Sequence, residues 1–236
     1  MTFFAFDLET TELAADRATG AVPPISCAAI ALADGSAQGM FLPSAEPDCY
    51  DAGGVMSAVG AVRVVRRLEE LVAAGGTLVT WNGAGFDLPV LAQASGLRAE
   101  CARLALASVD MMFQVLATKG WPIKLAVALE GMGLPGKTGD GREAVTLWRE
   151  GRHQEVLDYC AADAARTLQL AVAAQGERLR WTSGKGTPQS LSLAGGWLTV
   201  EQCLKLPEPD TSWMDQPLRR TDLLAWCSAG QPHLQG

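Results

Sequence analysis

The pattern of apolar and polar positions predicts strands at the start of the chain. Residues 2–7 alternate aromatic with small side chains and end in Asp7, which is typical of a strand. Residues 25–32 and 39–42 are two further apolar runs, and the polar residues 34–36 between them are typical of a turn. Together the three segments predict a meander of three strands.

Helices are predicted after this meander. Apolar residues recur at helical spacing over residues 55–74, and Gly75 and Gly76 end that helix. A short run rich in β-formers follows at residues 77–81. Further helices are predicted at residues 87–94, 100–108, 111–119, 123–132, 141–148 and 154–175. Strands followed by helices predict an α/β fold, with a mixed β-sheet flanked by α-helices.

The composition changes near residue 180 to Gly, Ser, Pro and Thr with interspersed tryptophans. We therefore predict one domain over residues 1–180 and a small Trp-containing C-terminal extension over residues 181–236. A capping box of Thr199 and Gln202 predicts one short helix there, and residues 218–227 a second. The tryptophans of this extension are expected to serve in packing, with base stacking as the alternative.

Acidic residues stand in two of these segments at spacings that place them on one face. Asp7 and Glu9 are two residues apart in a strand, where side chains alternate between faces. Tyr159 and Asp163 are four residues apart in a helix, which also puts them on one face. Taken alone, an acidic pair such as Asp7 and Glu9 at the end of a strand is more often a solvated turn or a helix cap than a catalytic pair. Several crowded carboxylates, however, are costly unless a cation pairs with them.

A fourth acidic residue, Asp87, follows a turn after the strand at residues 77–81 and can supply a further carboxylate. Two divalent ions about 3.5 to 4 Å apart would polarise a phosphate and make a bound water acidic. Oxygen ligands favour Mg2+ or Mn2+ over Zn2+. Tyr159 is a poor general base because its ordinary pKa is about 10. We expect its hydroxyl to orient the attacking water.

Three motifs now stand in order: Phe-Asp-x-Glu-Thr at 6–10, Asn-x3-Phe-Asp at 82–87 and Tyr-x3-Asp at 159–163. In these motifs the chain resembles the 3'-5' exonucleases of the DEDD superfamily, which have a ribonuclease H-like fold. The tyrosine subclass (DEDDy) is indicated, because the histidine subclass has His where this chain has Asp158. The chain is most similar to stand-alone predicted exonucleases related to the proofreading domain of family B DNA polymerases, over about residues 2–175.

The resemblance implies the roles of five residues. Asp7, Glu9, Asp87 and Asp163 are expected to bind two Mg2+ or Mn2+ ions, and Tyr159 to position the water. The implied activity is a metal-dependent 3'-5' exonuclease, a hydrolase of phosphodiester bonds. Its expected partners are 3' ends of single-stranded DNA or RNA, with DNA favoured by the similarity to a polymerase domain.

Candidate substrate-binding residues adjoin the first two motifs. By the resemblance, Thr10 lies where relatives contact the terminal nucleotide, and Asn82 belongs to the second motif. Phe86 could stack on a base, although packing in the core is the alternative. Three basic residues could also line a phosphate track, or simply form solvated surface: Lys137, Arg142 and Arg152.

The overall charge and the cysteines limit the other possibilities. A formal net charge of -7 argues against wrapping a long duplex, but bound divalent ions would neutralise the acidic site. The six scattered cysteines contain no CxxC pair, which predicts free thiols in a reducing compartment. The sequence has neither a signal-like start nor a membrane-spanning apolar run, so we expect a cytoplasmic protein without membrane contact.

Two alternative functions share the same fold. One is a non-catalytic nucleic-acid-binding module, which the complete set of carboxylates disfavours. The other is a structure-specific endonuclease, which would cut a circular single strand.

Overall fold

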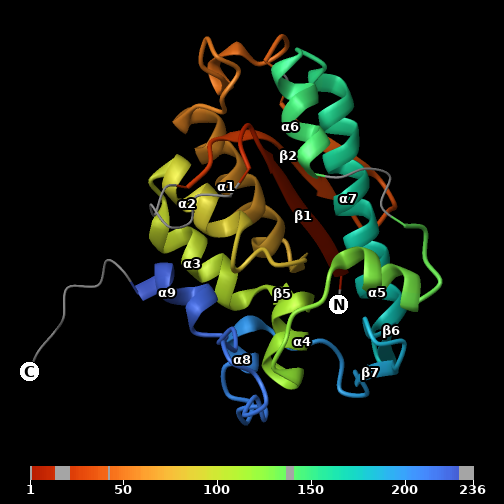
Figure 1. The fold of residues 1–236 in the computed structure, drawn as a ribbon. Helices are drawn as coiled ribbons and strands as arrows, with labels where there is room; N and C mark the ends of the chain where they lie inside the picture. Colours follow the sequence, from red (N-terminus) through yellow and green to blue (C-terminus); the bar gives the residue numbers. More distant parts are fainter. Residues whose placement is uncertain (1, 14–21, 42, 137–140, 229–236) are drawn as a thin grey trace, which may run out of the picture.

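The structure is a computed structural model that describes residues 2–13, 22–41, 43–136 and 141–228. Its centre is a five-stranded sheet with the strand order β3-β2-β1-β4-β5 (Figure 1). The strands are β1 (Thr2–Thr10), β2 (Ile25–Ala31), β3 (Ala37–Met40), β4 (Gly76–Thr80) and β5 (Val109–Asp110). The predicted meander is therefore confirmed.

Strand pairing in this sheet is mixed. β1 pairs antiparallel with β2 and parallel with β4, while β4 pairs parallel with β5. Helices separate the parallel strands along the chain, as such connections require. The mixed sheet with flanking helices confirms the predicted α/β class and is consistent with a ribonuclease H-like fold.

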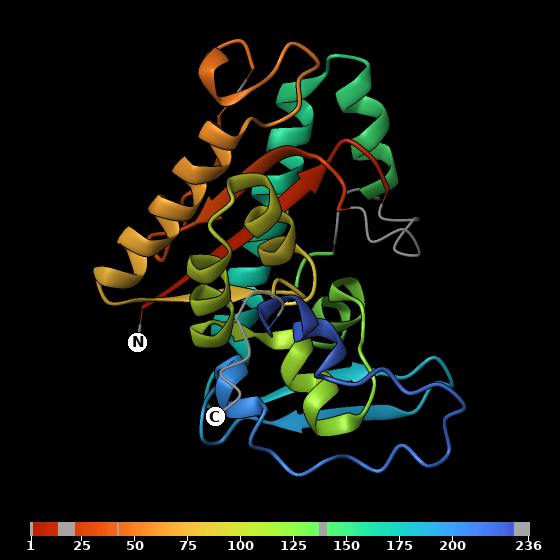
Figure 2. The same ribbon diagram turned by 90° about the vertical axis from the view of Figure 1, so that its left-hand side faces the viewer.

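Helices cover both faces of the sheet. One face carries α7 (His153–Ala174), which packs across β1, β2 and β3. The other face carries α1, α2 and α3, seen in front of the strands in Figure 2, with α7 behind them. The remaining bounds are α1 (Ala58–Ala73), α2 (Asp87–Ser95), α3 (Arg98–Ala107), α4 (Met111–Lys119), α5 (Leu125–Gly131) and α6 (Gly141–Arg149).

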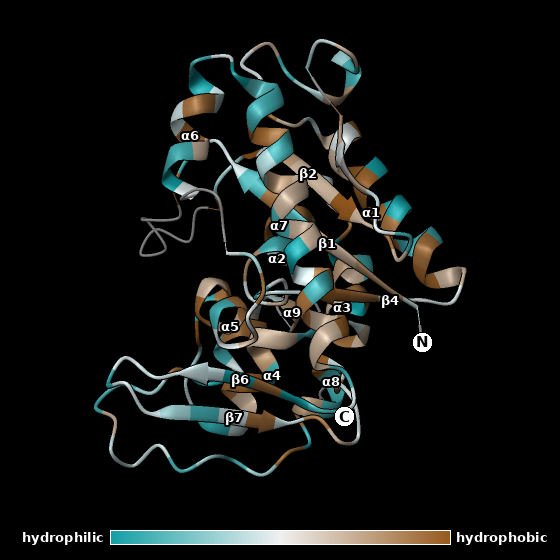
Figure 3. Cartoon of the chain, turned by 90° about the vertical axis from the view of Figure 1, so that its right-hand side faces the viewer, coloured by the Kyte–Doolittle hydropathy of each residue, from teal (hydrophilic) through white to brown (hydrophobic). Residues whose placement is uncertain are grey.

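The central strands are apolar because they are covered on both sides. Every residue of β2 is buried, and the alternation in β1 gives way to burial of both faces from Phe3 to Phe6. Such double burial is typical of strands between two helical layers. Figure 3 shows the contrast with α1 and α6, whose surfaces alternate between hydrophilic and hydrophobic colours. The site residues of β1 begin where this apolar run ends.

The C-terminal extension is packed against the sheet domain. A hairpin of β6 (Arg178–Thr182) and β7 (Pro188–Ser192) contacts α5, and α8 (Val200–Cys203) contacts α3 and α4. The last described elements are a 3-10 turn (Asp222–Leu224) and α9 (Ala225–Ser228). The hairpin begins close to residue 180, and the division into two domains at that point stays a prediction.

The tryptophans of the extension differ in their environment. Trp181 and Trp197 are buried in the common hydrophobic core, as packing residues would be. Trp213 instead is 66% exposed and lies edge-on to Trp121, with ring centroids 5.8 Å apart. Trp226 is half-buried. Packing is therefore the observed environment of two of these side chains, while Trp213 is on the surface.

Several sequence predictions need correction. The strand predicted to end at Asp7 continues to Thr10, because pairing with β2 extends it past the apolar run. The strands β5, β6 and β7 were not predicted; they are short and depend on their partners. The predicted helix at residues 218–227 is a 3-10 turn followed by a single helical turn. The capping box of Thr199 and Gln202 is confirmed.

Among the described residues, no helix combines the length and the apolar character that a membrane crossing would need. All six cysteines are free, as expected, and Cys227 is the one that is not fully buried.

Candidate active site

The acidic residues of the first motif lie near the end of β1. Asp7 is paired with Ala29 and Glu9 with Cys27 on β2, and the register then shifts between Glu9 and Thr10. Such irregularities bend a strand and redirect its side chains. Because Asp7 and Glu9 are two residues apart, both carboxylates leave β1 on the same side.

The long helix α7 supplies the third carboxylate. Oxygen atoms of Asp7, Glu9 and Asp163 all lie within 4.8 Å of one another. Asp163 is only 1% exposed, and Nη1 of Arg166, one turn further along α7, is 3.4 Å from its Oδ1. Residues that are more than 150 positions apart in the sequence therefore converge, because α7 crosses β1.

Tyr159 stands one turn before Asp163 on the same face of α7. Burial raises the pKa of its hydroxyl, and so do the negative charges of Asp163 and Glu9 and a hydrogen bond with the Asp163 side chain. A phenol in this environment keeps its proton at neutral pH. Tyr159 can therefore donate a hydrogen bond but cannot serve as a general base.

Asp87 reaches the same region from the other face of the sheet. It begins α2, and its Oδ1 accepts a hydrogen bond of 3.1 Å from the backbone N–H of Leu8, between the two acidic residues of β1. Burial raises the pKa of this carboxyl well above its usual range, and the nearby charge of Asp7 raises it further. The four predicted acidic residues are thus neighbours, although Asp87 is outside the tight group of three.

This set of donors fits hard divalent cations. The close oxygens are carboxylates, the ligand type that Mg2+ and Mn2+ prefer. The nearby thiol of Cys160 lies 3.5 Å from Oδ2 of Asp7, and burial raises its pKa well above the usual range. A protonated thiol is a donor to Asp7 rather than a metal ligand. The acidic cluster is therefore a candidate site for divalent cations.

One buried acidic residue was missed by the sequence reasoning. Asp110 ends β5 and is 1% exposed. Its carboxylate accepts hydrogen bonds from the backbone N–H groups of Asn82, Ala84 and Phe113 at 2.9 to 3.0 Å. Burial raises the pKa of this carboxyl, while these bonds act against the rise. Its position before a predicted helix signals an N-cap, but nothing in the sequence points to the contacts with the turn.

Of the three candidate substrate-binding residues, Thr10 follows Glu9 on β1, while Asn82 and Phe86 lie in the turn before Asp87. Thr10 is buried, and its hydroxyl donates to the carbonyl of Glu12 at 2.6 Å. Asn82 has a left-handed backbone with φ 68°. Phe86 is half-buried and packs against the hydrophobic core, as the alternative to base stacking requires. Their contact with substrate stays a prediction.

The basic candidates have mixed environments. Lys137 lies outside the described residues. Arg142 is exposed on α6. Arg152 forms two hydrogen bonds of 2.6 Å with Glu155 on the surface. Asp158 is exposed, and its Oδ1 accepts a hydrogen bond of 2.8 Å from Nε2 of Gln154.

Comparison with known proteins adds one match. Residues 98–176 match the family described as a predicted 3'-5' exonuclease related to the exonuclease domain of PolB. This segment is less than half of the chain; it contains Tyr159 and Asp163 but not the acidic residues of β1 and α2. No curated protein matches the sequence. The match supports a 3'-5' exonuclease, and with it a nucleic-acid substrate and dependence on divalent metal ions.

Proposed function

We propose that this protein is a metal-dependent exonuclease that removes nucleoside monophosphates from the 3' end of single-stranded nucleic acid. The observation that carries the proposal is the convergence of Asp7, Glu9 and Asp163 within 4.8 Å, with the Tyr159 hydroxyl bonded to Asp163. The family match over residues 98–176 independently supports the same class of activity.

Asp7, Glu9, Asp87 and Asp163 would hold two Mg2+ or Mn2+ ions in this proposal. When bound, such ions polarise the scissile phosphate, acidify a water and stabilise the leaving oxygen. The Cys160 thiol donates to Asp7 Oδ2 at 3.5 Å, and the Leu8 amide donates to Asp87 at 3.1 Å. These donors fix the orientation of the two carboxylates, as hydrogen-bond partners of metal ligands commonly do.

Tyr159 has a distinct role in the proposed tyrosine-dependent reaction. Its raised pKa keeps the hydroxyl protonated. A protonated phenol next to Asp163 can hold a water by a hydrogen bond and fix its line of attack, which lowers the entropic cost of reaching the transition state. It does not take the proton of that water.

The test is digestion of 5'-labelled single-stranded oligonucleotides with Mn2+. A ladder of products shortened from the 3' end is expected, and it should disappear with Asp7→Ala or with a chelator. No ladder, or a ladder that Asp7→Ala leaves unchanged, would refute the proposal. Cutting of a circular single strand would indicate an endonuclease instead, and metal-independent binding without turnover would indicate a binding module.

DNA is the favoured substrate because the matched family is related to the exonuclease domain of PolB. Discrimination between DNA and RNA depends on contacts to the 2'-hydroxyl. Matched DNA and RNA oligonucleotides of identical sequence, compared by kcat/KM, test this preference. A higher kcat/KM on RNA would reverse it.

A further inference from the structure

A tight turn precedes Asp87, and side chains from other parts of the chain bind this turn. The turn, residues 82–86, connects β4 to α2. It begins at Asn82, whose φ of 68° is a left-handed conformation that is uncommon outside glycine, although Asn adopts it more readily than most residues. Backbone of this kind persists when surrounding groups fix it.

On the inner side the turn is held by Asp110. Its Oδ1 accepts from the Asn82 N–H at 3.0 Å and from the Phe113 N–H at 3.0 Å, and its Oδ2 accepts from the Ala84 N–H at 2.9 Å. One carboxylate thus joins the turn to the start of α4. A buried carboxylate with three backbone donors has little freedom to move.

On the outer side the turn is held by the C-terminal extension. The indole Nε1 of Trp226 donates to the Ala84 carbonyl at 2.9 Å, and the Trp226 carbonyl accepts from Arg98 Nε at 2.8 Å. The Leu223 side chain lies so close to Gly85 that a Cβ there would be 2.9 Å from it. The extension therefore contacts both polar and apolar parts of the turn.

We propose that Asp110 and Trp226 are positioning residues that clamp the turn 82–86 between them, so that Asp87 is held facing Asp7. The effect on catalysis rests on the function proposed above, whereas the clamp itself does not. Ala84 is the shared point, since its N–H is bound by Asp110 and its carbonyl by Trp226. The C-terminal extension thereby becomes part of the framework of the acidic cluster.

Trp226→Phe tests the outer contact, and Trp197→Phe is its matched control. Trp197 also lies in the extension and donates through Nε1 to a backbone carbonyl, that of Ala171, at 2.9 Å. Each change keeps an aromatic ring and removes one indole N–H. Hydrogen exchange of peptides covering residues 82–87 and Mn2+ binding followed by electron paramagnetic resonance are measured on both proteins, together with Tm.

Trp226→Phe is expected to speed exchange in the turn and to weaken Mn2+ binding by about fivefold, the effect of losing one hydrogen bond. Trp197→Phe is expected to leave both unchanged, even where it lowers Tm. Equal effects of the two variants on the turn, or no effect of Trp226→Phe, would overturn the outer half of the clamp.

Asp110→Asn tests the inner contact without changing the size of the side chain. Its amide carbonyl can still accept one pair of bonds, but its NH2 group then faces the Ala84 N–H, donor against donor. Weakening of Mn2+ binding by about tenfold or more is expected, with faster exchange of the Ala84 amide. Unchanged exchange and Mn2+ affinity would overturn the inner half.

The proposed nuclease function and the proposed clamp on the turn can be refuted independently of each other. If the wild-type protein degrades no oligonucleotide, the proposed function fails, and hydrogen exchange still decides the clamp. If the protein is a nuclease, both variants are expected to lower kcat at saturating substrate more than they raise KM. A change in KM alone would show that the turn serves substrate binding rather than the position of Asp87.

Discussion

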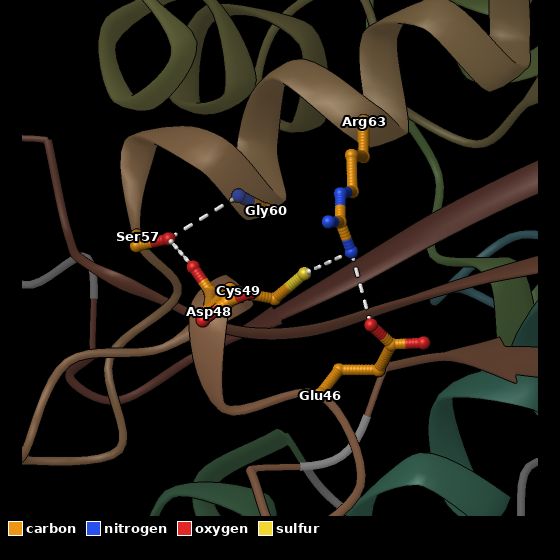
Figure 4. A network of polar contacts seen from close by, with 6 residues as sticks. All are labelled: Glu46, Asp48, Cys49, Ser57, Gly60 and Arg63. Atoms are coloured by element: carbon orange, nitrogen blue, oxygen red, sulfur yellow. Dashed lines mark hydrogen bonds and ion pairs between the residues drawn. The ribbon is translucent and has the colours of Figure 1, made fainter.

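The acidic cluster on β1 and α7 can be compared with the polar network around Arg63 on α1. In Figure 4, Arg63 reaches the Glu46 carboxylate at 2.9 Å and the Cys49 sulfur at 3.3 Å, while Ser57 caps α1. Arg63 and Glu46 are each nearly half exposed. They lie beside a cavity of about 460 Å³ between α1 and the strands β2 and β3.

The two regions differ in the signs and the burial of their charged side chains. Around Arg63, opposite charges are paired at the surface, where such pairs add little to stability. In the acidic cluster, the carboxylates of Asp7, Glu9 and Asp163 gather at buried or half-buried positions, and burial near Asp7 raises the pKa of the neighbouring Asp87 carboxyl. Residues whose arrangement opposes stability are typical of functional sites. The comparison therefore supports the proposed function of the cluster, and it favours a structural role for the Arg63 network.

The largest expected effect comes from Asp87→Asn, which removes the carboxylate that neighbours the acidic cluster. Nuclease activity is expected to fall by at least about a hundredfold. Asp87 is a proposed metal ligand, and loss of a ligand lowers activity more than loss of a residue that only hydrogen-bonds to one. The metal-free protein is expected to gain about 2 to 4 °C in Tm at pH 8, because a buried charge is removed and the amide oxygen still accepts from Leu8. Wild-type activity, or a lower Tm, would contradict the assignment.

A smaller loss of activity is expected from Tyr159→Phe. We expect kcat to fall by about tenfold to a hundredfold with little change in KM, since the proposed role of the hydroxyl is to position a water. Tyr50→Phe is the control. The Tyr50 hydroxyl donates a long, weak hydrogen bond of 3.5 Å to the Phe41 carbonyl. Steady-state kinetics with Mn2+ measure both. Equal losses in the two variants would remove Tyr159 from the reaction.

Stability should depend on pH and Mn2+ together. Because the pKa of Asp87 is raised on folding, the metal-free native state holds a proton more tightly than the unfolded chain. The contribution of protonated Asp87 to the free energy of unfolding is present at low pH, and it is lost as pH rises through the pKa that Asp87 has in the folded protein. Mn2+ requires the ionised carboxylate, so the Mn2+-induced rise in Tm should be larger at pH 8 than at pH 5.

At an Mn2+ concentration about one hundred times the dissociation constant, the rise at pH 8 should be about 5 to 10 °C. Thermal scans of the wild type and Asp87→Asn across this pH range provide the measurement. In Asp87→Asn, the Mn2+-induced rise in Tm should change less with pH than in the wild type. A Tm rise that is independent of pH would show that the cation binds elsewhere.

The smallest effect is expected from Glu46→Gln, which breaks the Arg63 network. Tm should change by at most about 3 °C, since exposed ion pairs contribute little, and the change should shrink in high salt. Nuclease activity should equal that of the wild type in the digestion assay. A tenfold loss of activity would extend the functional region to the cavity beside α1.

Local patterns were sufficient to predict the longer elements. The predicted helix at residues 111–119 is confirmed with the same bounds as α4, because its start is an aspartate N-cap and its end a glycine. The hairpin of β6 and β7 was not predicted. Arg178–Thr182 does alternate between exposed and buried residues, but a strand of this length forms only with a partner and a covering helix.

The contacts of Asp110 show a second limit. A local reading makes this residue an N-cap, and it does accept a bond from Phe113. Its bonds to Asn82 and Ala84, 28 and 26 residues away, depend on β4 lying beside β5. No periodicity in the sequence encodes such a contact.

The sequence by itself determined which side chains share a face. The spacings of Asp7 with Glu9 and of Tyr159 with Asp163 are local consequences of strand and helix periods, so they hold wherever those elements lie. Only the tertiary structure decided that the two faces meet, because that depends on α7 crossing β1. It also decided that Trp226 bonds to Ala84, 142 residues away, since such a contact forms only once the whole chain has packed.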